Sequence, residues 1–234
     1  MAQDPRRVDV SLLTHLADLT RSAIPRVHPA GWPFVAGGLS LTALGLKWRT
    51  PRLLGLGFAA ASAAFFRNPQ RTPPIRDGVV VAPADGVVAL VDEAAPPAEL
   101  GLGEDPWPRV SVFLSLLNAH VQRAPAAGTV VRVEHVAGRF LPADLKDASR
   151  VNERMSVLID TDAGSPLVVV QIAGLIARRI VCDAVPGQRL GLGETYGLIR
   201  FGSRVDTYLP RGTAVDVAVG QHTLAGETLI GVLR

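Results

Sequence analysis

The chain has 234 residues and a formal net charge of +3, and 48% of its residues are hydrophobic, enough for a core that needs no disulfide or metal. Its single cysteine excludes an internal disulfide and a metal cluster of paired thiols, and it indicates a reducing compartment. Lys47 and Lys146 are the only lysines, so the basic residues are overwhelmingly arginines, which suit phosphate groups. With no basic tract and no aromatic stacking platform, we expect no nucleic-acid partner.

Residues 1–70 are predicted to be helical and to anchor the protein to a membrane. From Asp9 to Ile24, leucines and an alanine recur at helical spacing, which predicts an amphipathic helix. Two uncharged segments follow, 27–46 and 53–66, separated by a basic connector. A membrane-spanning helix needs about 20 predominantly apolar residues, but the second segment is too short and prolines interrupt the first. We expect a helical hairpin that enters one leaflet, with arginines against anionic head groups. The alternative is a hydrophobic helix pair packed on a soluble core.

Residues 71–234 are predicted to be mainly β. Short runs of β-forming residues alternate with Gly, Pro and Asp, which is typical of an antiparallel β sandwich or barrel. Loops are expected at 93–108 and at 139–154, the second with one helical turn. The predicted strands are Val79–Ala82, Val87–Val91, Val110–Leu117, Thr129–Val136, Met155–Asp160, Leu167–Ile172, Leu175–Val181, Leu198–Phe201, Val205–Leu209, Ala214–Val219 and Thr228–Leu233.

A short internal repeat lies near the C-terminus. Residues 187–195 match residues 220–228 at five of nine positions, each copy having a Gly-Gln turn and then a Gly-Glu turn. This pattern resembles the half-repeat of the lipoyl and biotinyl hammerhead domains, which raises a membrane-tethered carrier or binding module as an alternative function. Those domains attach their cofactor to a lysine on an exposed hairpin, and neither lysine lies near these turns. We therefore interpret the repeat as architecture.

The Gly202-Ser203 pair stands between two predicted strands. Such a pair is usually only a turn. Because glycine has no side chain and adopts conformations that other residues avoid, a serine hydroxyl after it could also attack the Gly202 carbonyl and convert the amide to an ester. The pair therefore leaves two interpretations, a turn or a self-cleavage site.

Five motifs in register favour self-cleavage. In their order and spacing along nearly the whole chain, with the one that contains Gly202-Ser203 coming last, these motifs resemble those of the short-form phosphatidylserine decarboxylase proenzymes. The motifs are Phe65–Arg71, Pro83–Gly86, Asn118–Pro125, Asn152–Arg154 and Phe201–Ser203.

The resemblance implies a pyruvoyl enzyme. Ser203 would cut the chain into a β chain, 1–202, and an α chain, 203–234, and would become the pyruvoyl group, a covalent pyruvate cofactor. Phosphatidylserine would form a Schiff base with that group and leave as phosphatidylethanolamine and CO2. Decarboxylation needs an electron sink, and with so few lysines and no glycine-rich phosphate loop, pyridoxal phosphate is not expected. The same chemistry on another serine phospholipid stays open.

Motif positions also imply roles for the other site residues. His120 would be the base for self-cleavage and a later proton donor, oriented by Asp85. Long-form members of the family have a second histidine where this chain has Arg123, so that histidine's role does not carry over. Arg123, Arg178 and Arg179 are weaker candidates for binding the substrate phosphate or carboxylate, and no metal site is expected. The partners would be the phospholipid, a membrane surface and the protein's own two chains, with the catalytic domain on the cytoplasmic face of the cell membrane. The oligomeric state stays open, a homodimer included.

Overall fold

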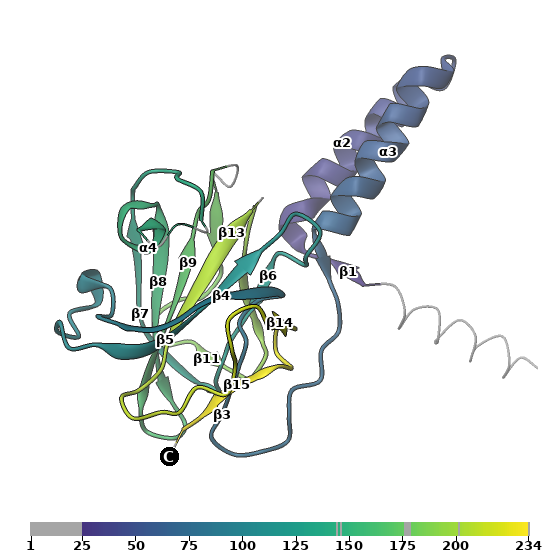
Figure 1. Ribbon diagram of the computed structural model, residues 1–234. Helices are drawn as coiled ribbons and strands as arrows, with labels where there is room; N and C mark the ends of the chain where they lie inside the picture. The colour runs from purple at the N-terminus through teal and green to yellow at the C-terminus, as the bar shows by residue number, and fades with distance from the viewer. Residues whose placement is uncertain (1–24, 144, 146, 176–178, 201, 234) are drawn as a thin grey trace, which may run out of the picture. The chain divides into compact units, whose positions relative to one another are not determined.

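The computed structural model describes residues 25–143, 145, 147–175, 179–200 and 202–233. The amphipathic helix predicted at Asp9–Ile24 lies outside these residues. Contacts between Cα atoms divide the chain into two compact units, 1–70 and 71–234, which are described separately below (Figure 1).

The first unit is a helical hairpin, α2 (Trp32–Leu44) and α3 (Arg49–Phe65), closed at its base by β1 (Arg26–Val27) and β2 (Arg67–Asn68) (Figure 1). The 3-10 helix η1 (Pro29–Gly31) leads into α2. The predicted segment 27–46 is therefore helical only from Trp32 onward. The second helix begins four residues earlier than predicted, because a proline is accommodated in the first turn of a helix.

The two helices approach each other through glycines. A Cβ at Gly38 would lie 2.7 Å from the backbone nitrogen of Ala59, and one at Gly55 would lie 2.6 Å from the backbone nitrogen of Thr42. The small residues thus occupy the interface, and many large apolar side chains of the helices point outward. None of the described helices is both long and apolar enough to cross a membrane.

The second unit is built on an antiparallel eight-stranded sheet in the order β11-β7-β8-β9-β13-β5-β4-β14, which curls into a half-barrel (Figure 1). Two smaller sheets, β10-β12-β6 and β15-β3, complete the unit. The prediction of a mainly β, antiparallel fold is confirmed. The strand bounds are β3 (Val79–Val81), β4 (Gly86–Ala94), β5 (Trp107–Leu114), β6 (Val121–Arg123), β7 (Gly128–Val136), β8 (Arg154–Thr161), β9 (Pro166–Ile172), β10 (Ile180–Cys182), β11 (Arg189–Leu190), β12 (Thr195–Ile199), β13 (Ser203–Tyr208), β14 (His222–Thr223) and β15 (Leu229–Val232).

The unit has two hydrophobic clusters on opposite faces of the large sheet, because side chains alternate along a strand. Leu167 and Val169 of β9 belong to the larger, inner cluster, whereas Val168 and Val170 belong to the smaller, outer one. The same alternation in β13 sends Val205 inward and Tyr208 outward. The outer cluster is capped by the 3-10 helix η2 (Ala98–Leu100), within the predicted 93–108 loop.

The internal repeat forms two equivalent corners of the fold. In the first corner, the Gly187 N–H donates to the Val130 carbonyl, and the Gln188 carbonyl accepts from the Val130 N–H. In the second corner, Gly220 and Gln221 form the same two backbone hydrogen bonds with Val88. A Pro-Ala-x-Gly turn lies beside each corner, at 83–86 and at 125–128, because Gly86 pairs with Thr223 and Gly128 pairs with Leu190. These turns are a second repeat, which the sequence analysis missed. The hammerhead-like turns are thus part of the scaffold.

Two details of the strand prediction were wrong. Ala214–Val219 is not a strand, since only Val215 forms an isolated bridge, with Gly231. The short strands β6, β11 and β14 were not predicted, because two or three residues do not establish an alternating pattern. The loop at 139–154 does contain one helical turn, α4 (Ala148–Val151), as expected.

Candidate active site

The Gly202-Ser203 pair lies where the chain passes from the small sheet to the large one. β12 ends at Ile199 and β13 begins at Ser203. Gly202 has a φ of +61°, in the left-handed region that favours glycine. Its carbonyl oxygen packs against Gly174, so closely that a Cβ on Gly174 would lie 2.1 Å from that oxygen. The carbonyl that the proposed chemistry needs is therefore held against a second glycine.

Ser203 is fully buried at the first position of β13, between β5 and β9. It stands two residues before Val205, so its side chain is on the inner face of the sheet with the larger cluster. Its Oγ is a buried polar atom with no hydrogen-bond partner among the described residues. Most buried hydroxyls have such a partner, and a catalytic role is one reason why a buried hydroxyl lacks one.

His120 lies beside the strand that leads to this junction. Its backbone carbonyl accepts a hydrogen bond from the N–H of Ile199, four residues before Ser203. Its ring is buried, and Nδ1 lies 2.9 Å from the carbonyl oxygen of Asn118. A carbonyl can only accept, so Nδ1 carries a proton, and in the neutral form of the ring Nε2 is the basic nitrogen. A backbone carbonyl thus fixes the tautomer of His120.

Two buried glutamines brace His120, and the sequence analysis missed both. Gln122 donates through Nε2 to the His120 carbonyl at 2.8 Å and accepts from Gln171 at 2.9 Å. Gln171 stands opposite Val205 in the sheet, on the inner face that Ser203 also occupies. The pair links β6, which begins directly after the histidine, to β9, the strand beside the serine.

Asp85 lies at the same edge of the large sheet as Ser203. β4 and β13 are both antiparallel to β5, and Val87 and Arg204 both pair with Phe113. The start of β4 is thus two strands, or about 10 Å, from the start of β13. The hydrogen bonds described for the Asp85 carboxylate come from Arg71 at 2.7 Å and from the N–H of Ala225 at 2.8 Å. Its predicted role in orienting His120 stays a prediction.

The predicted substrate-binding arginines have different surroundings. Arg123 is half-buried and donates to the Gly193 carbonyl at 2.8 Å; burial and the nearby Arg71 charge lower its pKa. Arg178 lies outside the described residues. Arg179 is exposed, and its carbonyl accepts from the N–H of Arg200, which is two residues before Gly202. Burial, and then the charge of Arg179, lower the pKa of Arg200. Arg200, which the sequence analysis did not select, places a second positive charge near the junction.

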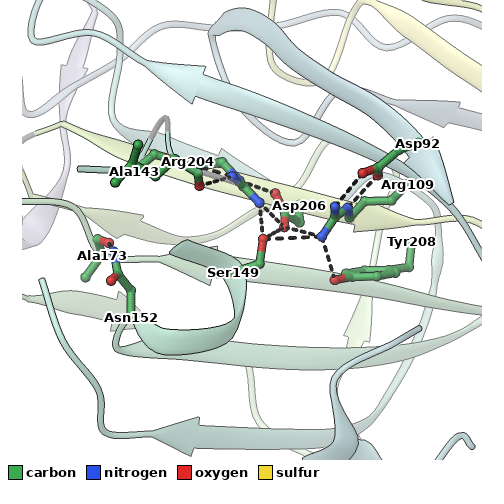
Figure 2. Close-up of polar contacts among 10 residues, drawn as sticks. Asp92, Arg109, Ala143, Ser149, Asn152, Ala173, Arg204, Asp206 and Tyr208 are labelled. Carbon is green, nitrogen blue, oxygen red and sulfur yellow. Dashed lines mark hydrogen bonds and ion pairs between the residues drawn. The ribbon is translucent and has the colours of Figure 1, made fainter. Parts of the chain in front are cut away.

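On the outer face of β13, which Tyr208 also occupies, a buried ion pair begins a polar network (Figure 2). Arg204 donates to both oxygens of Asp206 at 2.7 and 2.9 Å, and both side chains are fully buried. Burial alone would raise the pKa of Asp206, but hydrogen bonds from Arg204 and the charges of Arg204 and Arg109 lower it. The pair is therefore charged inside the protein.

The network continues to the far end of β13 through Arg109 (Figure 2). Arg109 forms a bidentate pair with Asp92 at 2.8 Å for both contacts and also donates to the Tyr208 hydroxyl. Ser149 links the Arg204–Asp206 pair to the Arg109–Asp92 pair, because its hydroxyl contacts Arg204, Arg109 and Asp206.

The same contacts fasten the loop at 139–152 to the junction (Figure 2). Arg204 donates to the carbonyls of Ala143 and Leu145. Asn152, in a motif that sequence analysis selected, donates to the Ala173 carbonyl at 2.8 Å, one residue before Gly174. The loop is thereby tied to β13 and to the segment that directly follows β9. Among the described side chains, no group of three His, Cys, Asp or Glu residues could hold a metal ion.

Comparison with known proteins identifies the family. Residues 58–231 match the model of the phosphatidylserine decarboxylase family. The chain is 57% identical to a phosphatidylserine decarboxylase proenzyme of Mycobacterium ulcerans over 239 aligned positions that cover 100% of both chains. It is 59% identical to the proenzyme of Mycobacterium tuberculosis H37Rv over 220 residues, which are 94% of this chain and 95% of that protein. The chain therefore belongs to the phosphatidylserine decarboxylase family.

Proposed function

We propose that the protein cuts itself between Gly202 and Ser203 and then, as a pyruvoyl enzyme, decarboxylates phosphatidylserine to phosphatidylethanolamine and CO2. One observation carries the proposal. In a chain of this family, a buried serine hydroxyl without a described hydrogen-bond partner follows a glycine whose carbonyl is immobilised against Gly174. The products are a β chain, 1–202, and an α chain, 203–234.

Self-cleavage needs no outside oxidant or reductant. Ser203 Oγ loses its proton and bonds to the Gly202 carbonyl carbon, while the C–N bond to Ser203 breaks and its nitrogen is protonated. Loss of the Ser203 α-proton then breaks the Cβ–O bond, which leaves a carboxylate on Gly202 and a dehydroalanine at 203. Addition of water and loss of ammonia convert that residue to pyruvoyl.

We assign the base for the first step to His120, because the contact of Nδ1 with the Asn118 carbonyl leaves Nε2 as the ring nitrogen that can accept a proton. The Gln122 and Gln171 pair holds the backbone of His120 in place. In the mature enzyme the same nitrogen would return a proton to the product. Asp85, at the same sheet edge, would support His120 during the first step, and Arg179 and Arg200 would attract the anionic head group.

The pyruvoyl carbonyl supplies the electron sink that the amino-acid side chains lack. The chain fits this group, since its precursor serine is buried, away from competing water, at a strand end fixed by two neighbouring strands.

The helical hairpin would anchor the enzyme to a membrane. At 1.5 Å per residue, the 13 residues of α2 and 17 of α3 extend about 20 and 26 Å, less than the roughly 30 Å apolar thickness of a bilayer. Its outward side chains include Leu44, Trp48, Leu54 and Phe58, and Lys47, Arg49 and Arg52 lie at or beside the turn. We infer a monotopic or peripheral anchor, with the catalytic unit on the cytoplasmic face.

A carrier module is not favoured. Of the two lysines that a carrier could modify, Lys47 lies in the turn of the hairpin and not on a repeat corner. The use of a different serine phospholipid is separated from our proposal by assaying ester-linked and ether-linked lipids side by side.

The decisive experiment is an intact-mass spectrum under denaturing conditions of the purified protein and of Ser203→Ala. We expect two chains that meet between residues 202 and 203, the smaller blocked at its N-terminus, and an uncut variant. An uncut, unmodified wild-type chain that persists on incubation would refute self-cleavage at this site.

Two further variants test the assigned parts. His120→Ala should block or slow the cut, and normal maturation with full turnover would remove His120 from the mechanism. Deletion of residues 1–66 should move the protein from the membrane to the supernatant in a flotation assay. Equal flotation of both proteins would show that the hairpin is not the anchor.

A further inference from the structure

The edge of the large sheet that holds Ser203 is also where neighbouring segments leave the sheet. β5 ends at Leu114, which pairs with Ser203, and β9 ends at Ile172, which pairs with Arg204. The segments that follow these two strands must therefore emerge beside the start of β13 (Figure 1).

These segments expose leucines to solvent. Leu116 and Leu117, directly after β5, are 53% and 85% exposed, and Leu175, after β9, is 60% exposed. Leu145 is exposed on the loop whose carbonyls Arg204 holds. We call Leu116, Leu117, Leu145 and Leu175 the leucine rim. Single exposed leucines are ordinary on soluble proteins, but four on segments that border one buried serine form a local concentration.

Positive charge accompanies the leucine rim. Arg179 is exposed close to the junction, and Arg139 is exposed three residues after the end of β7. That end, Val136, pairs with Arg154, which pairs with Ile172, so it belongs to the same sheet edge. The exposed Asp147 on the intervening loop is offset by Arg150 at 3.8 Å. Leucines next to arginines match a surface with an apolar interior and anionic head groups.

We infer that the leucine rim is a membrane-docking surface of the catalytic unit, and that its occupant is the surface of a bilayer containing anionic phospholipid. The hairpin would keep the protein at the membrane, whereas the rim would turn the sheet edge that holds Ser203 toward the head groups. A lipid head group could then reach the buried position 203 while its acyl chains stay in the apolar layer. This benefit to turnover rests on the proposed function, but the docking itself does not.

Fluorescence on the full-length protein tests the docking. In a Cys182→Ala background, Leu117→Cys is labelled with an environment-sensitive dye, and vesicles of phosphatidylcholine and phosphatidylglycerol are added. The matched control is Val185→Cys, since Val185 is 58% exposed on the turn that bonds to Val130. Val130 pairs with Ile159 and Ile159 with Leu167, at the opposite end of the strands.

We expect brighter emission at 117, quenched by lipids that carry a quencher in their acyl chains, and no such change at 185. Equal responses at both positions, or none at 117, would overturn the inference. A change at 117 that depends on protein concentration and not on vesicles would assign the rim to contact between copies, and would overturn it too.

Kinetics supply the second test. The double variant Leu116→Ser, Leu117→Ser should lose about a hundredfold in kcat/KM on long-chain phosphatidylserine in vesicles, since each leucine withdrawn from an apolar layer loses about a factor of ten. It should keep the wild-type value on a short-chain phosphatidylserine below its micelle concentration, and Val185→Ser should keep both. Equal losses on the two substrates would overturn the docking role. If no variant, including the wild type, decarboxylates either lipid, the proposed function fails while the fluorescence result still decides the surface.

Discussion

Replacing Gly174 with alanine should slow self-cleavage strongly while leaving the fold intact. The added methyl carbon would lie 2.1 Å from the Gly202 carbonyl oxygen and 3.3 Å from the Ala143 methyl group. Ordinary carbon–oxygen contacts are about 3.3 Å, so the carbonyl or the Gly174 backbone must move by about 1 Å. Both sides of the contact are backbone, which leaves no flexible side chain to give way.

The moved atom belongs to the bond that is cut. A misplacement of about 1 Å between reacting groups can cost roughly a hundredfold in rate. Overpacking of this kind typically costs about 1–3 kcal/mol of folding free energy, which a domain of this size can tolerate. We therefore expect a folded Gly174→Ala protein whose precursor is processed about a hundred times more slowly.

The assay is a time course of intact masses after purification of the precursor, with thermal unfolding measured on the same samples. Gly191→Ala is the control, because the nearest neighbour of its methyl group would be Glu194 Oε2, at an ordinary contact distance of 3.5 Å. Processing of Gly174→Ala at the wild-type rate would refute the reasoning that Gly174 positions the scissile carbonyl. A Gly174→Ala protein without a cooperative unfolding transition would show that the contact serves the fold instead.

Three other predictions concern buried groups. Asp206→Asn leaves Arg204 without its counter-charge and should lower the free energy of unfolding by about 3–5 kcal/mol in urea titrations. The control Asp162→Asn, in an exposed pair with Arg189, should lower it by less than about 1 kcal/mol. Similar losses in the two variants would contradict the argument that burial makes the Arg204–Asp206 pair important. Because the pKa of Asp206 is lowered in the folded state, its contribution to stability is present above the unfolded pKa of about 4 and is lost as the pH falls below that value. The melting temperature of Asp206→Asn should therefore fall less steeply with acid than that of the wild type. Equally steep declines of the two melting temperatures would count against this carboxylate. Burial raises the pKa of Cys182 to about 11, so its thiol should resist alkylation at pH 8 in the native protein and react after denaturation, and rapid native labelling would be the contrary result.

The sequence predicted self-cleavage chemistry at residues whose motifs are local. Gly202-Ser203, His120 and Asp85 each stand in a short motif, and the structure places all three at or near one edge of the large sheet. Their catalytic roles remain predictions. The helical hairpin and the predominance of antiparallel strands also followed from local patterns of apolar residues.

The supporting residues could not be found in this way, because their importance depends on pairing between distant strands. Gly174 matters only because β9 ends next to the start of β13. Arg204 and Asp206 alternate with Val205, a pattern that indicates a solvent-facing side of a strand, yet the 139–152 loop covers them completely. Gln171 offered a faint signal, as a polar residue within the apolar run 167–172. The opposite error occurred at 214–219, where an alternating pattern gave only one bridge.

The central position of β13 has a consequence for the lifetime of the enzyme. β13 lies between β5 and β9, while β14 and β15 of the same C-terminal segment pair with β4 and β3. After the cut we propose, the 32-residue α chain would be held to the β chain noncovalently, by strand pairing at three separate places. Precursor folding brings these strands together within one molecule, but two separated fragments would have to find each other at low concentration, with a gap open in the sheet. We therefore expect maturation to convert a protein that can refold into one that survives only by unfolding slowly.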